Sequence, residues 1–225
     1  KSITLSGRYV KTLRGIYQKQ KSCMNCNGKG CRTCFFHGIS EFDSIEGIIS
    51  QFLFKKFGGT TAKFTWIGGE DKSSLVLGAG RPFFVKIQNP NKRKSKLISL
   101  NLDSLKLVNL KIIDKFPIKP VKFTSSLELK ISSKNIIDSK YLKKLKHLVN
   151  TPVVVYDKSG KRFEKQIFSV NYKKHSLHNF SLFLNAEGGL PIRRFIEGGD
   201  IIPDISNLLN CECICDEFDF HEINV

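Results

Sequence analysis

Residues 64–87 read "FTWIGGEDKSSLVLGAGRPFFVKI" and place two adjacent acids, Glu70 and Asp71, among glycines. A Gly-Gly pair precedes the acids and a Gly-Ala-Gly-Arg-Pro turn is expected after them, and glycines let a ligand approach the backbone closely. Acids are scarce in this chain, 20 against 37 lysines and arginines. The two acids therefore either decorate a solvent-exposed loop or include one acid that the basic surface serves.

Period-two alternation of apolar residues, interrupted by Gly, Asn and Pro, predicts more strands than helices and hence an α+β fold. The predicted strands cover 63–67, 81–87, 121–131, 152–156, 162–170, 180–186 and 211–225. The predicted helices cover 44–56, 139–149 and 191–196. An acidic capping box from Asp43 to Glu46 is expected to begin the first helix. Residues 97–113 fit either a strand pair or a helix followed by a strand.

The composition indicates a globular protein with a polyanionic partner. A formal charge of +17 and a pI near 9.6 attract phosphate backbones, although solubilising lysines are the plain alternative. Nucleic acid is the expected partner; an anionic membrane is not, because no lysine-rich helix combines a strong apolar face with Trp. No apolar run reaches about 18 residues and the start has no signal-peptide pattern, so we expect a cytoplasmic protein without a membrane span. The chain lacks an initiator Met, which indicates processing or truncation.

Four of the seven cysteines form two CxxC pairs, Cys23 with Cys26 and Cys31 with Cys34, separated by a short glycine-containing turn. Each pair can direct two thiolates at one tetrahedral ion, so the spacing predicts a zinc knuckle. Four thiolates leave no open coordination position, and we expect a structural ion. A disulfide or reactive set is the alternative, which the missing secretion signal disfavours.

The remaining cysteines, Cys211, Cys213 and Cys215, alternate along the predicted last strand. Because free cysteines behave as small hydrophobic residues, we interpret them as core residues and not as ligands.

Residue chemistry alone leaves the role of the acidic loop open. Arg81 offers a fork for phosphate or carboxylate, or could brace the glycine-rich loop from behind. A metal-dependent nuclease would use Glu70 and Asp71, but it needs a third acid converging on them. The candidates for that acid are Glu187, Glu197 and Asp200.

The stretch "IGGEDKSSLVLGAGRPFFVKIQNP" (67–90) resembles the family of archaeal and eukaryotic tRNA pseudouridine synthases that act on T-loop uridines, usually numbered 54 and 55. Other blocks resemble this family in the same order. They are "SGRYVKTLRGIYQ" (6–18), the zinc knuckle (23–34), "DSIEGIIS" (43–50), "KFTSSL" (122–127), "TPVVVY" (151–156) and "AEGGLPIRRFIEGG" (186–199). The likeness covers nearly the whole chain, without the family's usual amino-terminal RNA-binding domain.

The resemblance implies a bent, mixed or antiparallel sheet flanked by helices, with a small zinc-knuckle appendage. It implies isomerisation of uridine to pseudouridine in tRNA without an organic cofactor. Asp71 falls on the position of the catalytic nucleophile or base, and the target uridine must leave its stack to reach it. Arg193 falls on the position of the cation that keeps this carboxylate ionised, so the two side chains are expected to touch.

Several positions depart from the family pattern. Gly69 stands where the family has Arg, and Thr124 stands where it has the active-site tyrosine, with Phe123 one residue earlier. Phe123 could stack on uracil, but a slip of one residue reverses the face of a strand unless a bulge restores it. The family's "HRR" is replaced by Asp157-Lys158-Ser159, and its "TY" by Leu190-Pro191. A catalytically inactive relative that binds RNA, alone or within an RNA–protein particle, is the alternative.

The RNA contacts are expected from exposed cations. They are Lys92, Arg93, Lys94 and Lys96, then Arg8, Lys11 and Arg14, then Lys143, Lys144 and Lys146. Phosphate contacts of this kind set affinity and register with little base readout. The expected domains are an amino-terminal segment with the knuckle (1–42) and a catalytic core (43–225), and a separate protein is a candidate supplier of the missing RNA-binding domain.

Overall fold

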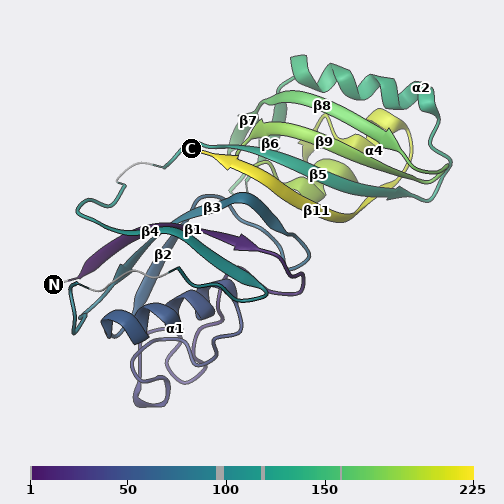
Figure 1. The fold of residues 1–225 in the computed structure, drawn as a ribbon. Coiled ribbons are helices and arrows are strands. Elements are labelled where there is room, and N and C mark those ends of the chain that lie inside the picture. Colours follow the sequence, from purple (N-terminus) through teal and green to yellow (C-terminus); the bar gives the residue numbers. More distant parts are fainter. Residues whose placement is uncertain (1, 95–98, 118–119, 158) are drawn as a thin grey trace. The chain divides into compact units, whose positions relative to one another are not determined.

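The computed structural model describes residues 2–94, 99–117, 120–157 and 159–225, so Lys96 and Lys158 lie outside the described residues. The chain forms two compact units, Lys1–Val121 and Lys122–Val225. This division differs from the expected boundary between residues 42 and 43, which stays a prediction. Figure 1 shows the elements of each unit.

The first unit is built on an antiparallel sheet in the order β4-β1-β3, with β2 paired to β3. The strands are β1 (Ile3–Lys11), β2 (Ala62–Trp66), β3 (Val76–Ile87) and β4 (Leu105–Ile113). Alternate residues of β1 are buried, as the period of a half-covered strand requires. Leu5, Tyr9, Phe83 and Val85 lie in the core of this unit with no exposed surface.

The helix α1 (Ile45–Phe57) lies across one face of this sheet (Figure 1) and buries Ile45, Ile49, Leu53 and Phe57. The predicted helix over 44–56 is therefore confirmed, but its cap is not the expected one. Ser44 is the cap residue, and its hydroxyl accepts a hydrogen bond from the backbone N–H of Gly47 at 3.0 Å. Ser is as good a cap as Asp because its oxygen reaches the same unsatisfied N–H groups.

The second unit has a four-stranded antiparallel sheet in the order β11-β5-β9-β8 and a small sheet in the order β10-β6-β7. The larger sheet contains β5 (Thr124–Ser133), β8 (Ile167–Lys174), β9 (Asn179–Glu187) and β11 (Cys213–Asn224). The smaller contains β6 (Val153–Tyr156), β7 (Arg162–Lys165) and β10 (Ile201–Ile202). The helical segments are α2 (Ser139–Leu142), the 3₁₀ helix η2 (Lys143–Asn150), α3 (Ile192–Glu197) and α4 (Ile205–Leu209).

The α+β prediction is confirmed, and two local expectations are wrong. Residues 78–80 do not form a turn, because they lie inside β3. The predicted strand over 162–170 is divided between β7 and β8, which belong to different sheets. Within 97–113, the described part forms the single strand β4, with an isolated bridge from Asn101 to Lys106. Among the described residues, no helix combines the length and apolar character that a bilayer span requires.

Candidate active site and metal centre

The half-buried Asp71 lies on the loop between β2 and β3, and its carboxylate is held by its own loop. Its Oδ1 accepts hydrogen bonds from the backbone N–H of Ser73 at 2.8 Å and from the Ser73 hydroxyl at 2.7 Å. The Ser74 hydroxyl donates a third at 3.1 Å. Three donors on one oxygen stabilise the negative charge and fix the rotamer of the side chain.

Glu70 points into the protein, where it is the centre of a buried charge cluster. Its side chain and that of Arg81 have no exposed surface, and Arg81 Nε donates to Glu70 Oε2 at 3.2 Å. Lys11 Nζ lies 3.6 Å from Glu70 Oε1. Burial raises the pKa of Glu70, while the charges of Arg81 and Lys11 oppose that rise. A carboxylate enclosed in this way is unavailable to a metal ion, so the nuclease hypothesis loses its first ligand.

Arg81 takes the bracing role that was one of its two expected alternatives. Its Nη1 donates to the backbone carbonyl of Ile67 at 2.8 Å, at the start of the acidic loop. The guanidinium therefore joins β3 to both Ile67 and Glu70. Its expected direct contact with RNA stays a prediction, although no part of the Arg81 side chain is exposed in this conformation.

Lys11, at the end of β1, is not the surface cation that the sequence analysis expected. It is fully buried, and its Nζ donates to the backbone carbonyls of Asp71 at 3.1 Å and Lys72 at 3.4 Å. Arg14 Nη1 donates to the carbonyl of Ser73, and the N–H of Gly15 donates to the carbonyl of Lys72 at 2.7 Å. Donors from β1 and the segment after it thus hold the backbone carbonyls of residues 71–73, at and directly after Asp71.

A bulge in β3 brings Arg81 into place behind the loop. Tyr9 of β1 pairs with Arg81, but Lys11 pairs with Val76, so the β3 strand accommodates extra residues at this point. Gly80 has φ +78°, and a Cβ there would lie 2.5 Å from the backbone oxygen of Tyr9. Glycine is therefore required at position 80. Arg8, another expected RNA contact, donates from Nε to the carbonyls of this bulge, at 2.9 Å to Ala79.

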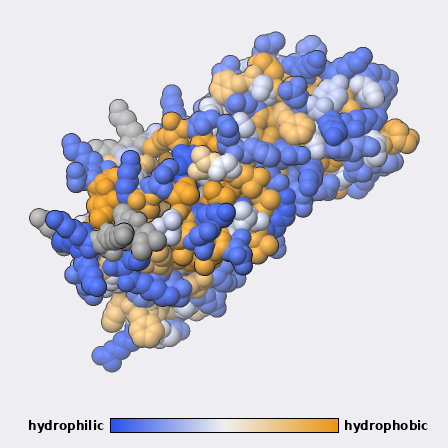
Figure 2. Space-filling view, viewed as in Figure 1, coloured by the Kyte–Doolittle hydropathy of each residue, from blue (hydrophilic) through white to orange (hydrophobic). Residues whose placement is uncertain are grey.

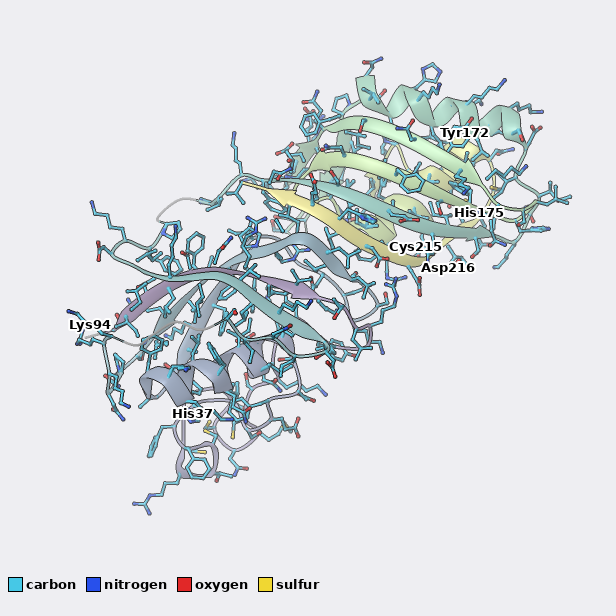
Figure 3. All side chains as sticks on the ribbon, in the orientation of Figure 1. His37, Lys94, Tyr172, His175, Cys215 and Asp216 are labelled. Carbon is cyan, nitrogen blue, oxygen red and sulfur yellow. The ribbon has the colours of Figure 1, made fainter. Side chains whose placement is uncertain are left out.

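Arg193 is the second residue of α3, and its Nη1 donates to the backbone carbonyl of Cys215 at 2.6 Å. Its guanidinium carbon lies 5.8 Å from the centre of the Phe218 ring. Both partners belong to β11, and Cys215 is labelled on that strand in Figure 3. Asp71 belongs to the first unit and Arg193 to the second, and the contact expected between them stays a prediction.

Thr124 is the first residue of β5 and Phe123 directly precedes it, at the place where the family tyrosine was expected. Thr124 pairs with Glu187 of β9, and the N–H of Gly188 donates to the Phe123 carbonyl at 2.7 Å. A Cβ on Gly188 would lie 2.4 Å from the Phe123 ring, so this glycine allows the ring to lie against the backbone. The ring is half-buried and anchored beside the turn that leads to α3.

A cavity of about 540 Å³ opens in the second unit beside these residues. Its lining includes Thr151 and Pro152 of the family-like "TPVVVY" block, together with Lys165 and Glu187. Lys165 Nζ lies 3.4 Å from Glu187 Oε1. The cavity therefore joins the Thr-Pro block to the strand that pairs with Thr124.

Among the candidate RNA-contacting cations that the structure describes, those after β3 and those of α2 and η2 are exposed. Lys92, Arg93 and Lys94 are exposed after β3, and Lys94 is labelled in Figure 3. In α2 and η2 the Leu142, Leu145 and Leu148 side chains are buried. The three candidate cations of this segment, Lys143, Lys144 and Lys146, are exposed, as is Lys140.

The four predicted ligands, Cys23, Cys26, Cys31 and Cys34, lie together, with all four sulfur atoms within 4.8 Å of one another. Cys34 Sγ is 3.8 Å from the Sγ atoms of Cys26 and Cys31. A tetrahedral ion with metal–sulfur bonds of about 2.3 Å separates its sulfurs by about 3.8 Å, so the quartet fits zinc geometry.

Backbone amides complete the donor set around the sulfurs. The N–H groups of Cys31 and Gly38 donate to Cys34 Sγ at 3.2 and 3.3 Å. Burial raises the pKa of the Cys34 thiol, but these backbone donors, together with hydrogen bonds from the Cys31 and Cys26 side chains, lower that pKa to about 6. His37 attaches the knuckle to α1, because its ring stacks on that of Phe54 with the two ring centres 4.0 Å apart. His37 is labelled beside the sulfur atoms in Figure 3.

Cys211, Cys213 and Cys215 are buried in the second unit, which confirms their prediction as core residues. Lys11 departs furthest from its expected place, because it was predicted at the surface and is buried. The signal was present, because Lys11 continues the buried alternation of Ile3, Leu5 and Tyr9. A cation in phase with apolar residues on a strand indicates a buried ion pair, and Glu70 is the acid that completes it.

The family model and the curated relatives agree on one family. Residues 4–224 match the family model described as Pus10, C-terminal. The chain is 64% identical over 225 residues to the tRNA pseudouridine synthase Pus10 of Nitrosopumilus maritimus (strain SCM1), covering all of this chain and 59% of that protein. It is 36% identical over 224 residues to the tRNA pseudouridine synthase Pus10 of Cenarchaeum symbiosum (strain A), covering 99% and 56%.

A more distant relative and a solved structure complete the comparison. The tRNA pseudouridine synthase Pus10 of Methanocaldococcus jannaschii is 32% identical over 240 residues, covering 98% of this chain and 52% of that protein. A crystal structure of a Cbf5-Nop10-Gar1 complex has a similar fold, with a TM-score of 0.51 and 8% identity, over 96% of this chain and 48% of that one. The chain therefore spans between half and three fifths of the relatives' lengths, and it belongs to the Pus10 C-terminal family.

Proposed function

We propose that this chain carries the catalytic centre of a tRNA pseudouridine synthase, which isomerises uridine to pseudouridine in the T loop at positions 54 and 55. The observation that carries the proposal is Asp71, which stands in a family-like "GED" block on a loop that buried charges hold from behind. The relatives are named for this activity, but the chain spans only 59% of the first of them, so the activity of the whole protein is inferred.

In the proposed reaction, the Asp71 carboxylate acts as nucleophile or base at the target nucleoside. The bond from N1 of uracil to C1′ of ribose breaks, the ring rotates, and C5 bonds to C1′ in its place. The proton lost from C5 is balanced by the one that N1 gains, so no redox partner or organic cofactor is required. The uridine must be everted from its stack to reach a carboxylate at this depth.

Two further residues are assigned supporting roles in the second unit. Arg193 supplies the guanidinium that keeps the Asp71 carboxylate ionised, because an opposite charge nearby favours the charged form. The Phe123 ring, held against Gly188, takes over the stacking function of the missing tyrosine.

Lys92 and Arg93 bind the tRNA backbone. The RNA-binding domain that family members usually carry comes from another part of the protein or from a partner.

We assign structural zinc to the four-cysteine centre. The 3.8 Å sulfur separations and the backbone N–H···S hydrogen bonds support an ion of this size with thiolate ligands. Four protein ligands fill the coordination shell, so this ion contributes to folding of the knuckle and takes no part in the isomerisation.

The proposed function is tested with an unmodified tRNA transcript, on which pseudouridine is mapped chemically after incubation with the wild-type chain or Asp71→Ala. We expect modification in the T loop with the wild type and none with the variant. Equal modification by both would remove Asp71 from the mechanism.

Thr124, which occupies the tyrosine position, favours the second candidate function, a catalytically inactive RNA-binding relative. Tight tRNA binding with no product from either protein would support it. Thr124→Tyr then separates the two functions further, because a restored tyrosine is expected to produce modification only if the remaining centre is competent.

A further inference from the structure

The zinc knuckle carries an exposed apolar surface that the proposed function does not use. Met24 is 89% exposed, Phe35 is 77% exposed and Phe36 is 52% exposed. We name these three residues the knuckle platform. Figure 1 shows the knuckle segment beyond α1, away from the sheet of its unit, and Figure 2 shows hydrophobic atoms on the surface at that end.

The backbone of the knuckle platform is strained. Phe35 and Phe36 have φ of +50° and +63°, the left-handed region that bulky side chains rarely adopt. The N–H of Phe36 donates to the Cys31 carbonyl at 2.9 Å and the N–H of His37 to the Cys34 carbonyl at 2.8 Å, so the cysteine ligands impose this path. Glycine or asparagine would follow it more easily. Two exposed aromatic residues at such positions contribute little to a core, which points to a function outside it.

The charge around the knuckle platform selects the kind of partner. Residues 21–38 contain Lys21, Lys29 and Arg32 and no acid, and Lys29 and Arg32 are exposed. Aromatic faces flanked by cations suit unpaired nucleotides, whose bases stack while their phosphates pair with the charges. A second copy of the chain is a poor partner for this surface, because each copy carries a formal charge of +17.

We propose that the knuckle platform is a binding site for an unpaired base of RNA, with Phe35 and Phe36 stacking on the base and Lys29 and Arg32 contacting the flanking phosphates. The choice of tRNA as the RNA rests on the proposed function, whereas the stacking site does not. The site would orient the RNA through a contact that is separate from the Asp71 loop.

The test uses the zinc-loaded full chain with both platform phenylalanines replaced by asparagine, Phe35→Asn and Phe36→Asn together. Asparagine tolerates the left-handed region, so zinc content and thermal stability are expected to be kept or to rise. The affinity for unmodified tRNA is expected to fall about 5- to 100-fold, the range for losing one stacked base. Phe168→Ala, which removes an exposed phenylalanine of β8 (46% exposed), is expected to leave the affinity unchanged.

The salt dependence distinguishes stacking from charge. The platform variant is expected to keep the slope of log affinity against log salt concentration, because no cation is lost. Lys29→Ala with Arg32→Ala is expected to reduce that slope by about one per cation. Phe35→Trp is the conservative variant, and it is expected to bind tRNA at least as tightly as the wild type.

Several results would overturn the proposal. They are unchanged tRNA affinity in the zinc-loaded platform variant, a change in self-association alone, or no measurable RNA binding by the wild type. The rate of isomerisation at saturating enzyme is expected to be unchanged in the platform variant. If the wild type forms no pseudouridine but its RNA affinity still depends on Phe35 and Phe36, the proposed function fails and the stacking site stands.

Discussion

Asp71 is positioned chiefly by residues that no substrate would touch. Its own carboxylate is fixed by Ser73 and Ser74, while the backbone on either side is held by Lys11 and, through Glu70, by Arg81. The neighbouring acids of the "GED" block therefore have opposite roles. Glu70 points into the protein and anchors the loop, and Asp71 is the acid to which we assign the chemistry.

Removing Arg81 should be costly because it leaves Glu70 buried without its closest cation. We expect Arg81→Met to lower the free energy of unfolding by about 3–5 kcal/mol, measured by urea denaturation. The double variant Glu70→Gln with Arg81→Met removes both charges and should recover much of that loss. A loss below about 1 kcal/mol in Arg81→Met would show that the ion pair does not anchor the loop.

The raised pKa of Glu70 predicts how the stability of the first unit depends on pH. Because burial raises this pKa in the folded state above the usual 4.5, folding favours the protonated carboxyl. The contribution of Glu70 is therefore largest below its unfolded pKa and is lost as pH rises through the folded pKa. We expect the stability of the wild type relative to Glu70→Gln to fall between pH 4 and the folded pKa. A difference that rises with pH would mean that the cations dominate over burial.

At the scale of elements, the β3 bulge and the end of β1 create the site. The register shift between Tyr9 and Lys11 places Arg81 behind the acidic loop, while the cap at Ser44 fixes where α1 begins. The sequence predicted the 81–87 part of β3 and the helix from periodicity, but it did not predict β1 as a strand. It did not predict the bulge, because a Gly-Ala-Gly run is compatible with a turn or with a strand whose partner closely approaches its backbone.

Gly80→Ala tests the bulge. Position 80 has φ +78° and a Cβ there would lie 2.5 Å from the Tyr9 oxygen, whereas Gly15 has φ +89° with nothing within 4 Å of its Cβ position. Gly15→Ala should cost only the backbone strain of about 1–2 kcal/mol. Gly80→Ala should cost clearly more, measured by thermal unfolding. Equal losses would show that the contact with β1 is relaxed at no cost.

Metal removal tests the knuckle. We expect chelation or Cys26→Ser to unfold the knuckle, because structural zinc sites of this kind fold with their metal. Hydrogen exchange should then increase over residues 21–38, while β1, β3 and β5 keep their protection. Unchanged protection of the knuckle after verified metal loss would show that the loop folds without an ion.

For the whole molecule, the features that could be predicted are those that depend on the periodicity of apolar residues or on the spacing of cysteines within a short stretch of sequence. The α+β class, the helix beginning near residue 44 and the four-cysteine cluster are confirmed. The alternation of β1 indicates that Lys11 is buried, but a window that contains only this strand cannot identify its partner, because Glu70 is 59 residues away. The division into units at Val121 was not predicted either, because no change in composition marks it.

The proposed role of Arg193 involves the whole molecule, because Arg193 is in the second unit and its proposed partner, Asp71, is in the first. We expect Arg193→Gln to slow pseudouridine formation about 100-fold at saturating enzyme with little change in tRNA affinity. Arg193→Lys should recover part of the rate, since the charge is kept without the fork. Exposed Arg162 of β7 provides the control, and Arg162→Gln is expected to retain the wild-type rate. An Arg193→Gln enzyme as fast as the wild type would show that another group stabilises the carboxylate.

The most direct measurement is the single-turnover rate of pseudouridine formation in the tRNA T loop by Asp71→Asn, beside Asp114→Asn. The control removes the same charge from an exposed acid of the first unit. We predict that Asp71→Asn binds tRNA like the wild type and loses at least about 10²–10⁴-fold in rate, while Asp114→Asn keeps the wild-type rate. Product formed by Asp71→Asn at the rate of Asp114→Asn would contradict the assignment of the reaction to this carboxylate.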